Sequence, residues 1–513
     1  MSAKLLRLFS LPMLMFLMGT FFLYQGQFDF FANDPGVGWH LASGKYILQN
    51  KVVPFEDPFL AFKVRPWISD QWLSDVIYYL GFSSGGWSAI YNFTALVFCL
   101  TFFAILLPWI YRFNSSWIAS TIGVFFAFKI SQIHFILRPV VFGFPFFAVT
   151  FLAALSWYRS GGSSRPWYLL GIFFVWANIH PSFILGLLII GLIIFAQFLD
   201  YFLSQTSSTI SGRELWCRLK PGVLLLGACL IVTLINPYGV ELHKSIFQLG
   251  QSDFFMNLNE EWMSPNFDEA SGKLFLIFSG MLLLPFLLGA RPAWRSGEFI
   301  LIFVFLYFTL KAVRFFPYVG IVYAPFVAEA LLSLGATGVI RNYRSLSLLR
   351  DGFSRLDARQ GFSAGLVALT LLVISVWGAV NHRILLFNKD LGPSKSKYPY
   401  EAVAFLRSSV PAGQSVSLLA SPDWGGFITL EGQGIIKPVV DDRNTLLGES
   451  FYKDFLEAAK TSSGWINFAH KVQADYFIIS AKSPMRCEVE KQGLKIVFED
   501  SNNILVEMKD SRE

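Results

Sequence analysis

The segment Asn33-Asp34-Pro35-Gly36-Val37-Gly38-Trp39-His40 directly follows the first long apolar run of the chain. It places a carboxylate, an imidazole and an indole where a membrane-spanning helix would leave the bilayer. A carboxylate held in such a position can act as a general base, which typically contributes roughly 10²–10⁴-fold to proton transfer. Asp34 is therefore the candidate catalytic residue. The alternative is a solvated carboxylate or an Asx turn at the following proline.

Other ionisable side chains also fall at the ends of apolar runs. Arginine suits a phosphate because its planar guanidinium donates two parallel hydrogen bonds, and charges at a membrane interface are costly enough to indicate function. Arg138 and Arg314 are therefore candidates for contact with an anionic group, with interfacial anchoring as the alternative. Lys311 and His180 are further candidates for the same role.

Several polar residues have a functional and a structural interpretation. His40 either supports the substrate site or packs against its neighbours. Asp57 contacts substrate or a metal, or begins a turn before a proline. Glu261 is a lid contact or part of a structural turn. Asp442 and Arg443 near the C-terminus are interpreted as a local ion pair.

The composition predicts a polytopic membrane protein. Of the 513 residues, 54% are hydrophobic and 15% charged, and the mean hydropathy is +0.51. A span needs about 20 mostly apolar residues, and we find about eleven such runs. The first is too long for a signal-peptide core, so we interpret it as an uncleaved span. The predicted spans are 9–31, 87–110, 116–134, 139–157, 167–180, 183–203, 221–236, 274–290, 297–312, 316–337 and 361–380.

Basic residues in the connections between spans predict the orientation. If Lys4 and Arg7 are cytoplasmic, every alternate connection is also cytoplasmic, and each of these connections is basic. They carry Arg112; Arg159 and Arg165; Arg213, Arg218 and Lys220; Arg291 and Arg295; and Arg341, Arg344, Arg350, Arg355 and Arg359. Topology thus explains the net charge of +6 and argues against nucleic-acid binding.

Two domains follow from this topology. Residues 1–385 form the transmembrane domain, whose first outer loop, 32–86, contains predicted interfacial helices near 39–48 and 67–80. Residues 386–513 form a small extracytoplasmic α/β domain, because helical and strand-like patterns are mixed there. The four cysteines have no CxxC or Cys/His spacing, which argues against disulfides and structural zinc.

The motifs along this framework resemble the GT-C superfamily of integral-membrane glycosyltransferases, in particular its bacterial protein mannosyltransferase and lipid A sugar-transferase branch. The resemblance covers nearly the whole chain. Its topology is fairly specific and its motifs are degenerate. The matching segments are Asn33-Asp34, 38–44, Val53-Pro54, Asp57-Pro58-Phe59, Pro66-Trp67-Ile68, Gln71-Trp72-Leu73, Leu137-Arg138-Pro139, 176–182, Asn236-Pro237-Tyr238-Gly239, 260–265, 423–426 and Asp441-Asp442-Arg443.

In that superfamily the first outer loop carries a catalytic acid and receives a sugar linked to a polyprenyl phosphate. The resemblance therefore implies that Asp34 is catalytic. Many relatives have two adjacent acids where this chain has Asn33-Asp34, which leaves the acceptor type and a divalent cation open. The expected substrate-binding residues are His40, Asp57, Arg138, His180, Tyr238, Glu261, Lys311 and Arg314.

The leading hypothesis is an inverting hexosyl or pentosyl transferase at the outer face of a bacterial inner membrane. It would move a sugar from a polyprenyl phosphate to a lipid, glycan or protein acceptor. An O-antigen-type polymerase or ligase is an alternative, although such proteins usually carry catalysis on a late outer loop. A secondary transporter would show repeats and midplane charges. A non-enzymatic envelope scaffold is the remaining alternative.

Overall fold

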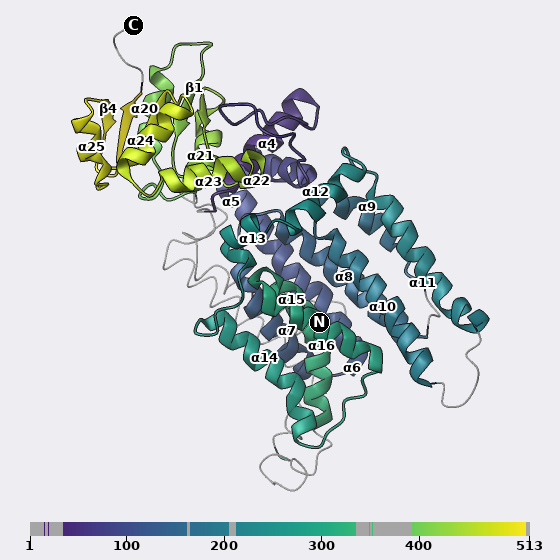
Figure 1. The fold of residues 1–513 in the computed structure, drawn as a ribbon. Coiled ribbons are helices and arrows are strands. Elements are labelled where there is room, and N and C mark those ends of the chain that lie inside the picture. Colours follow the sequence, from purple (N-terminus) through teal and green to yellow (C-terminus); the bar gives the residue numbers. More distant parts are fainter. Residues whose placement is uncertain are drawn as a thin grey trace, which may run out of the picture.

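The computed structural model describes Met15, Gly19 and residues 34–161, 165–204, 212–334, 348, 351 and 392–508. Apart from Met15 and Gly19, the predicted first span lies outside these residues, as does the predicted span at 361–380. Figure 1 shows a bundle of long helices with a smaller sheet-containing domain packed at one end. We call that end of the bundle the domain end.

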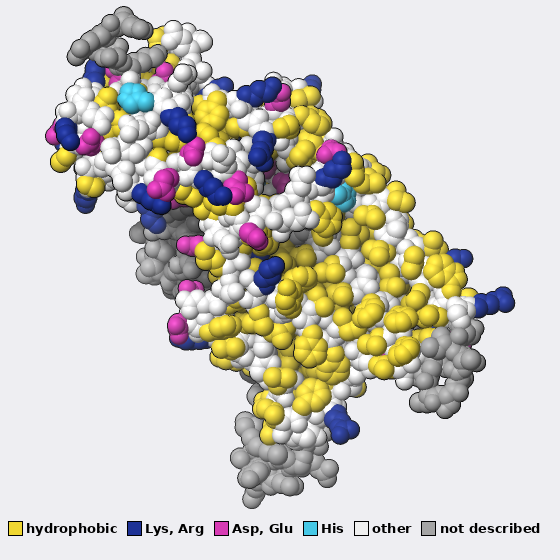
Figure 2. All heavy atoms as spheres, in the orientation of Figure 1, with side chains coloured by type: hydrophobic (Ala, Val, Ile, Leu, Met, Phe, Trp, Pro, Cys, Tyr) yellow, Lys and Arg dark blue, Asp and Glu magenta, His cyan; other side chains and the backbone are white. Residues whose placement is uncertain are grey.

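Apolar sequence accounts for the bundle. Six helical stretches in the described part are long and apolar enough to cross a membrane by length and composition. Hydrophobic side chains cover the flank of the bundle in Figure 2, whereas charged side chains gather on the sheet domain and at helix ends. The chain is therefore a multi-pass membrane protein. The main helices are α4 (Val37–Asn50), α5 (Trp72–Cys99), η1 (Leu100–Leu106), α6 (Leu107–Asn114), α7 (Trp117–Ser131), α8 (Val140–Arg159), α9 (Leu169–Ile179), α10 (Phe183–Ser204), α11 (Gly212–Thr233), α14 (Ala270–Leu287), α15 (Ser296–Lys311) and α16 (Phe316–Leu334).

Short helices connect these elements at the domain end. They are η2 (Gln132–His134), α12 (Val240–Gly250), α13 (Asp253–Leu258), η3 (Glu260–Trp262) and η4 (Val313–Phe315). Every span predicted within the described ranges coincides with a helix. One difference concerns the predicted interfacial helix at 67–80, most of which is the beginning of α5. The break that separates it from the membrane part falls at Gly85 and Gly86, where the backbone is not helical.

The C-terminal domain contains a five-stranded mixed sheet of order β2-β1-β3-β5-β4. β1 is parallel to β2 and β3, and β5 is antiparallel to β3 and β4. The predicted fold class, a helical membrane domain followed by a small α/β region, is confirmed. The elements are α20 (Tyr400–Ser409), β1 (Val416–Leu419), α21 (Pro422–Gly432), β2 (Ile436–Pro438), α22 (Asn444–Leu447), α23 (Glu449–Ala458), α24 (Ser462–Lys471), β3 (Tyr476–Ser480), α25 (Met485–Lys491), β4 (Lys495–Glu499) and β5 (Asn503–Glu507).

The first loop and the sheet domain meet where α4 packs on α21 (Figure 1). A Cβ on Gly38 would lie 2.0 Å from the carbonyl oxygen of Gly426, and a Cβ on Gly426 would lie 2.1 Å from that of Pro35. Only glycine allows such close backbone approach. These glycines therefore fix the sheet domain directly against the start of α4, beside Asp34.

Candidate functional site

Asp34 lies just before α4 with only 8% of its surface exposed. The Nε of Arg138 is 2.9 Å from Oδ1 and 2.7 Å from Oδ2 of this carboxylate. The backbone N–H of Gly36 also donates to Oδ1, at 2.9 Å. Both carboxylate oxygens are therefore held before any substrate binds.

Arg138 connects Asp34 to a third part of the chain. It lies immediately before α8, and its Nη1 is 3.0 Å from Oε1 of Glu261 in η3. Burial opposes ionisation of Glu261, but the charges of Arg138 and Arg314 outweigh it and hold the pKa of Glu261 below its usual value. Three of the predicted site residues thus form one continuous ion network.

Two positively ionisable side chains beside this network have unused hydrogen-bonding capacity. The guanidinium of Arg314, in η4, stacks 3.9 Å above the ring of Trp262 and makes no hydrogen bond or ion pair with any residue in the described ranges. His134, at the end of η2, is buried, and neither ring nitrogen has a partner there. A stacked arginine with free N–H groups is well suited to an anionic ligand.

The environment of His134 keeps its ring neutral. Burial lowers the pKa of His134 to about 4, assisted by the positive charges of Arg314 and Arg138 and opposed by Glu261. A neutral imidazole retains one N–H donor. His134 is not among the site residues predicted from the sequence. Its position four residues before Arg138 was the available signal.

His180 lies between α9 and α10, and its Nδ1 accepts a hydrogen bond from the N–H of Ser182 at 3.0 Å. Burial lowers the pKa of His180 to about 3, and the charges of Arg314 and His40 contribute in the same direction. His180 is therefore a neutral group close to the cationic part of the site. Its interaction with Arg314 places it in the same neighbourhood.

His40 has a structural environment. Its Nδ1 lies 2.6 Å from Oδ1 of Asp75, and both side chains are buried. The imidazole also packs on the indole of Trp39 with ring centres 3.6 Å apart. The His40–Asp75 contact joins α4 to α5, and so fixes the helix that begins at Val37, shortly after Asp34.

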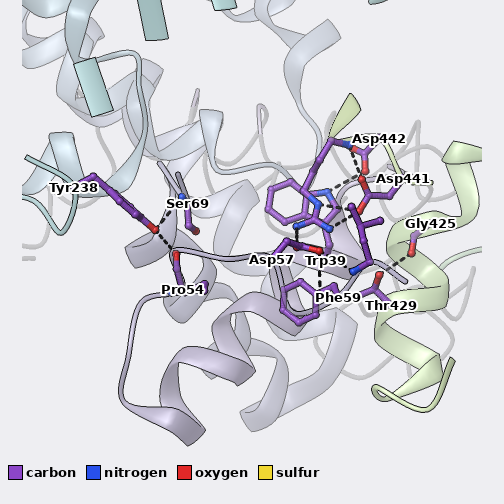
Figure 3. A network of polar contacts seen from close by, with 12 residues as sticks. Trp39, Pro54, Asp57, Phe59, Ser69, Tyr238, Gly425, Thr429, Asp441 and Asp442 are labelled. Atoms are coloured by element: carbon purple, nitrogen blue, oxygen red, sulfur yellow. Dashed lines mark hydrogen bonds and ion pairs between the residues drawn. The ribbon is translucent and has the colours of Figure 1, made fainter. Parts of the chain in front are cut away.

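Asp57 belongs to a second buried ion network, shown in Figure 3. Arg443 is 2.6 Å from Asp57 through Nη1 and 2.8 Å from Asp441 through Nε. Its guanidinium also lies over the rings of Trp39 and Trp67. This network joins the first loop to the sheet domain.

The predicted local ion pair between Asp442 and Arg443 is wrong. Arg443 turns toward Asp57 and Asp441, because those carboxylates neutralise it in a buried position. Asp442 instead points to the start of α4, where its Oδ1 accepts a hydrogen bond from Nε1 of Trp39 at 3.0 Å (Figure 3).

The last two predicted residues lie apart from the Asp34 network. The hydroxyl of Tyr238 donates to the carbonyl of Pro54 at 2.8 Å and accepts from the N–H of Ser69 at 3.0 Å, which closes the first loop (Figure 3). Lys311 is exposed at the end of α15, without a hydrogen bond or ion pair to the described part of the chain.

The space around Asp34 is narrow. The cavity beside it is bounded on the α4 side by Val37 and Gly38 and on the other side by Tyr398, Phe427 and Leu430, with room for about one water molecule. Among the described residues, no group of three or more His, Cys, Asp or Glu side chains could hold a metal ion.

The comparisons with known proteins agree with this architecture. No family model and no curated protein sequence matches the chain. Its fold is similar to that of the Archaeoglobus fulgidus oligosaccharyltransferase in the apo form, with a TM-score of 0.57, 14% identity and coverage of 92% of this chain and 69% of that chain.

Two further solved structures contain lipid phosphates. The archaeal oligosaccharyltransferase AglB from A. fulgidus, in complex with an inhibitory peptide and a dolichol-phosphate, matches with a TM-score of 0.54, 15% identity and coverage of 91% and 68%. ArnT from Cupriavidus metallidurans, bound to undecaprenyl phosphate, matches with a TM-score of 0.51, 12% identity and coverage of 97% and 98%. The chain therefore shares its fold with these oligosaccharyltransferase and ArnT structures, which fits the resemblance to the GT-C superfamily that its motifs indicated.

Proposed function

We propose that this protein is a membrane glycosyltransferase that moves a sugar from a polyprenyl phosphate to an acceptor at the domain end of the bundle. The observation that carries the proposal is the convergence of Asp34, Arg138 and Glu261 in one ion network beside the free guanidinium of Arg314. The lipid phosphates in the AglB and ArnT structures support a donor of this class.

The donor phosphate is proposed to bind between Arg138 and Arg314. Arg314 has no hydrogen bond or ion pair among the described residues, and Arg138 already shares its charge between two carboxylates. His134 and His180 add neutral imidazoles near these cations. Charge-assisted hydrogen bonds from arginine stabilise the negative charge that develops on the leaving phosphate.

In the proposed reaction, binding of the phosphate draws Arg138 away from Asp34 and leaves that carboxylate free. Asp34 then accepts a proton from the acceptor hydroxyl or amine as it attacks the anomeric carbon. The new bond forms on the face opposite the phosphate, and the carbon–oxygen bond to phosphate breaks with its electron pair on the phosphate oxygen. The anomeric centre is inverted.

The proposed location is a bacterial inner membrane, with the sheet domain outside the cytoplasm. Arg138 precedes α8 and Arg159 ends it, so the two residues lie at opposite ends of this helix. Arg159 and Arg295 meet at the end away from Asp34, where Arg295 donates to the carbonyl of Arg159. Basic residues gathered at that end support a cytoplasmic assignment for it.

The test uses the full-length protein in lipid nanodiscs. Sugar transfer is measured from a panel of undecaprenyl phosphate monosaccharides to acceptors in membranes of the organism that encodes the protein. Binding is measured with undecaprenyl phosphate alone. Asp34→Asn is expected to reduce transfer by about 10²–10⁴-fold, because the proposed base is lost. Binding of undecaprenyl phosphate is expected to persist. The control, Asp253→Asn, alters an exposed carboxylate at the start of α13.

Full transfer by Asp34→Asn would overturn Asp34 as the base. Failure of the wild-type protein both to bind undecaprenyl phosphate and to transfer any sugar of the panel would overturn the proposed function.

A further inference from the structure

Asp442 comes from the sheet domain, yet it lies beside Asp34. It follows β2 after a short connection, so it leaves the sheet at the carboxyl end of a parallel strand. Ligand-binding groups commonly occupy that edge in open α/β sheets. In Figure 3 its side chain lies with Trp39, away from Pro54 and Tyr238.

One oxygen of Asp442 is fixed and the other is free. Oδ1 accepts the indole N–H of Trp39 at 3.0 Å, whereas Oδ2 accepts no hydrogen bond from the residues that the structure describes. Oδ2 also faces Asp34. A Cβ built on Gly36 would lie 3.0 Å from Oδ2 of Asp442 and 3.2 Å from Oδ1 of Asp34. The two carboxylates therefore flank the same glycine.

Neighbouring contacts hold Asp442 in this place. Asp441 and Arg443 on either side of it are buried in the ion network with Asp57. The Gly38–Gly426 contact fixes the sheet domain against α4. A carboxylate anchored through both neighbours and through Trp39 loses little further freedom when it binds a substrate, which is the requirement for a preorganised site.

The surroundings of Asp442 favour its protonated form more than usual. Burial raises the pKa of Asp442 to about 7, and the negative charges of Asp441 and Asp34 act in the same direction, against Arg138 and Arg443. Tyr398 and Tyr452 also lie close enough to sense its charge. Near neutral pH this carboxylate can therefore change its protonation state, as a group that contacts a reacting hydroxyl or amine requires.

We propose that Asp442 is the second carboxylate of the active site and that its ionised Oδ2 accepts a hydrogen bond from an acceptor N–H or O–H other than the one whose proton Asp34 removes. This inference rests on the proposed function and deepens it. Asp34 removes the proton while Asp442 orients the acceptor group toward the anomeric carbon. The sheet domain thereby supplies part of the active site in addition to covering it.

The experiment compares wild type, Asp442→Asn and Asp454→Asn in full-length protein. Asp454 is an exposed carboxylate of the same domain, paired with Lys471, and serves as the matched control. Asp442→Asn is expected to bind undecaprenyl phosphate within about twofold of wild type but to transfer sugar at least about 10²-fold more slowly. The wild-type rate is expected to rise with pH through about 7, and this dependence is expected to disappear in the variant.

Wild-type transfer rates and an unchanged pH profile in Asp442→Asn would overturn the proposal.

A second readout does not depend on activity: carbodiimide coupling of glycine ethyl ester at pH 6.5, mapped by mass spectrometry. Asp442 is expected to be labelled, because one oxygen is free, while Asp34 is protected by Arg138. Absence of label on Asp442 would show that its carboxylate is not accessible to an acceptor, which would overturn the proposal. If Asp442 is labelled but the wild-type protein neither binds the donor nor transfers sugar, the proposed function is wrong and the accessibility of Asp442 is not.

Discussion

The two ends of α8 carry arginines with similar partners and different surroundings. At the domain end, Arg138 bridges Asp34 and Glu261. At the opposite end, Arg159 bridges Glu298 and Glu329, at 2.6 Å and 2.5 Å. The pattern of one arginine between two carboxylates is therefore not by itself a sign of function.

The difference lies in the ionisable groups beside each network, since at the Arg159 end the buried group without a partner among the described residues is the indole N–H of Trp157. At the Arg159 end, Arg295 and Trp294 donate to the remaining carboxylate oxygens, so each oxygen of Glu298 and Glu329 has a partner. At the domain end, His134 and one oxygen of Asp442 have no hydrogen bond within the described ranges. Buried polar groups are normally paired, and the exceptions call for an explanation such as a ligand. We interpret the Arg159 network as structural and the Arg138 network as a binding site.

The largest expected effect comes from comparing two glutamate variants, one in each network. Glu298 is only 1% exposed and pairs with Arg159, so for Glu298→Gln we expect a loss of about 3–5 kcal/mol in the free energy of unfolding. Glu261 is 27% exposed. For Glu261→Gln we therefore expect a loss of no more than about 1 kcal/mol, together with slower transfer. Chemical denaturation of the two purified proteins measures both losses of stability, and the transfer assay measures the rate. Equal losses would contradict the distinction between a structural and a functional network.

The second prediction concerns the free arginine. Arg314→Ala is expected to weaken binding of undecaprenyl phosphate by at least about tenfold, which corresponds to about 1.4 kcal/mol. Its thermal stability should change little, because Arg314 makes no ion pair with a described residue. Arg218→Ala is the control, since that arginine is exposed on α11. Unchanged affinity in Arg314→Ala would remove this residue from the phosphate site.

The third prediction uses the glycine between the carboxylates. Gly36 has φ −79° and ψ −21°, which alanine adopts without strain. A methyl group there would lie 3.0 Å and 3.2 Å from the two carboxylates. We expect Gly36→Ala to fold and to bind undecaprenyl phosphate but to transfer sugar about 10-fold more slowly, because misplaced reacting groups lose rate. A wild-type rate would show that the spacing of Asp34 and Asp442 is not critical.

The smallest expected effect is a pH dependence of stability. The folded-state pKa of Asp442, about 7, lies above its ordinary value of 3.8. Folding therefore favours the protonated form, and wild-type stability should fall relative to Asp442→Asn as pH rises from about 4 to about 7, by about 1 kcal/mol or more. Thermal unfolding at pH 4, 5.5 and 7.5 measures the difference. A constant difference between the two proteins would contradict the raised pKa.

Part of this architecture could be predicted from local sequence. Runs of apolar residues located the six described helices that are long and apolar enough to cross a membrane, because burial in lipid requires length and hydrophobicity that a single sequence displays. The same reasoning placed Asp34, Arg138 and Arg314 at helix ends. The predicted interfacial helix at 67–80 begins later, at Trp72, and continues as α5 through the non-helical Gly85 and Gly86 into the predicted span.

The sequence by itself determined that the chain spans the membrane many times and that its chemistry-bearing side chains lie at helix ends, because hydropathy and charge are local properties. Only the tertiary structure decided the pairing. Arg138 meets Asp34 across 104 positions, and Trp39 meets Asp442 across 403. Such contacts depend on how glycine backbones let α4 and α21 approach, and no periodicity or composition in either segment encodes its distant partner.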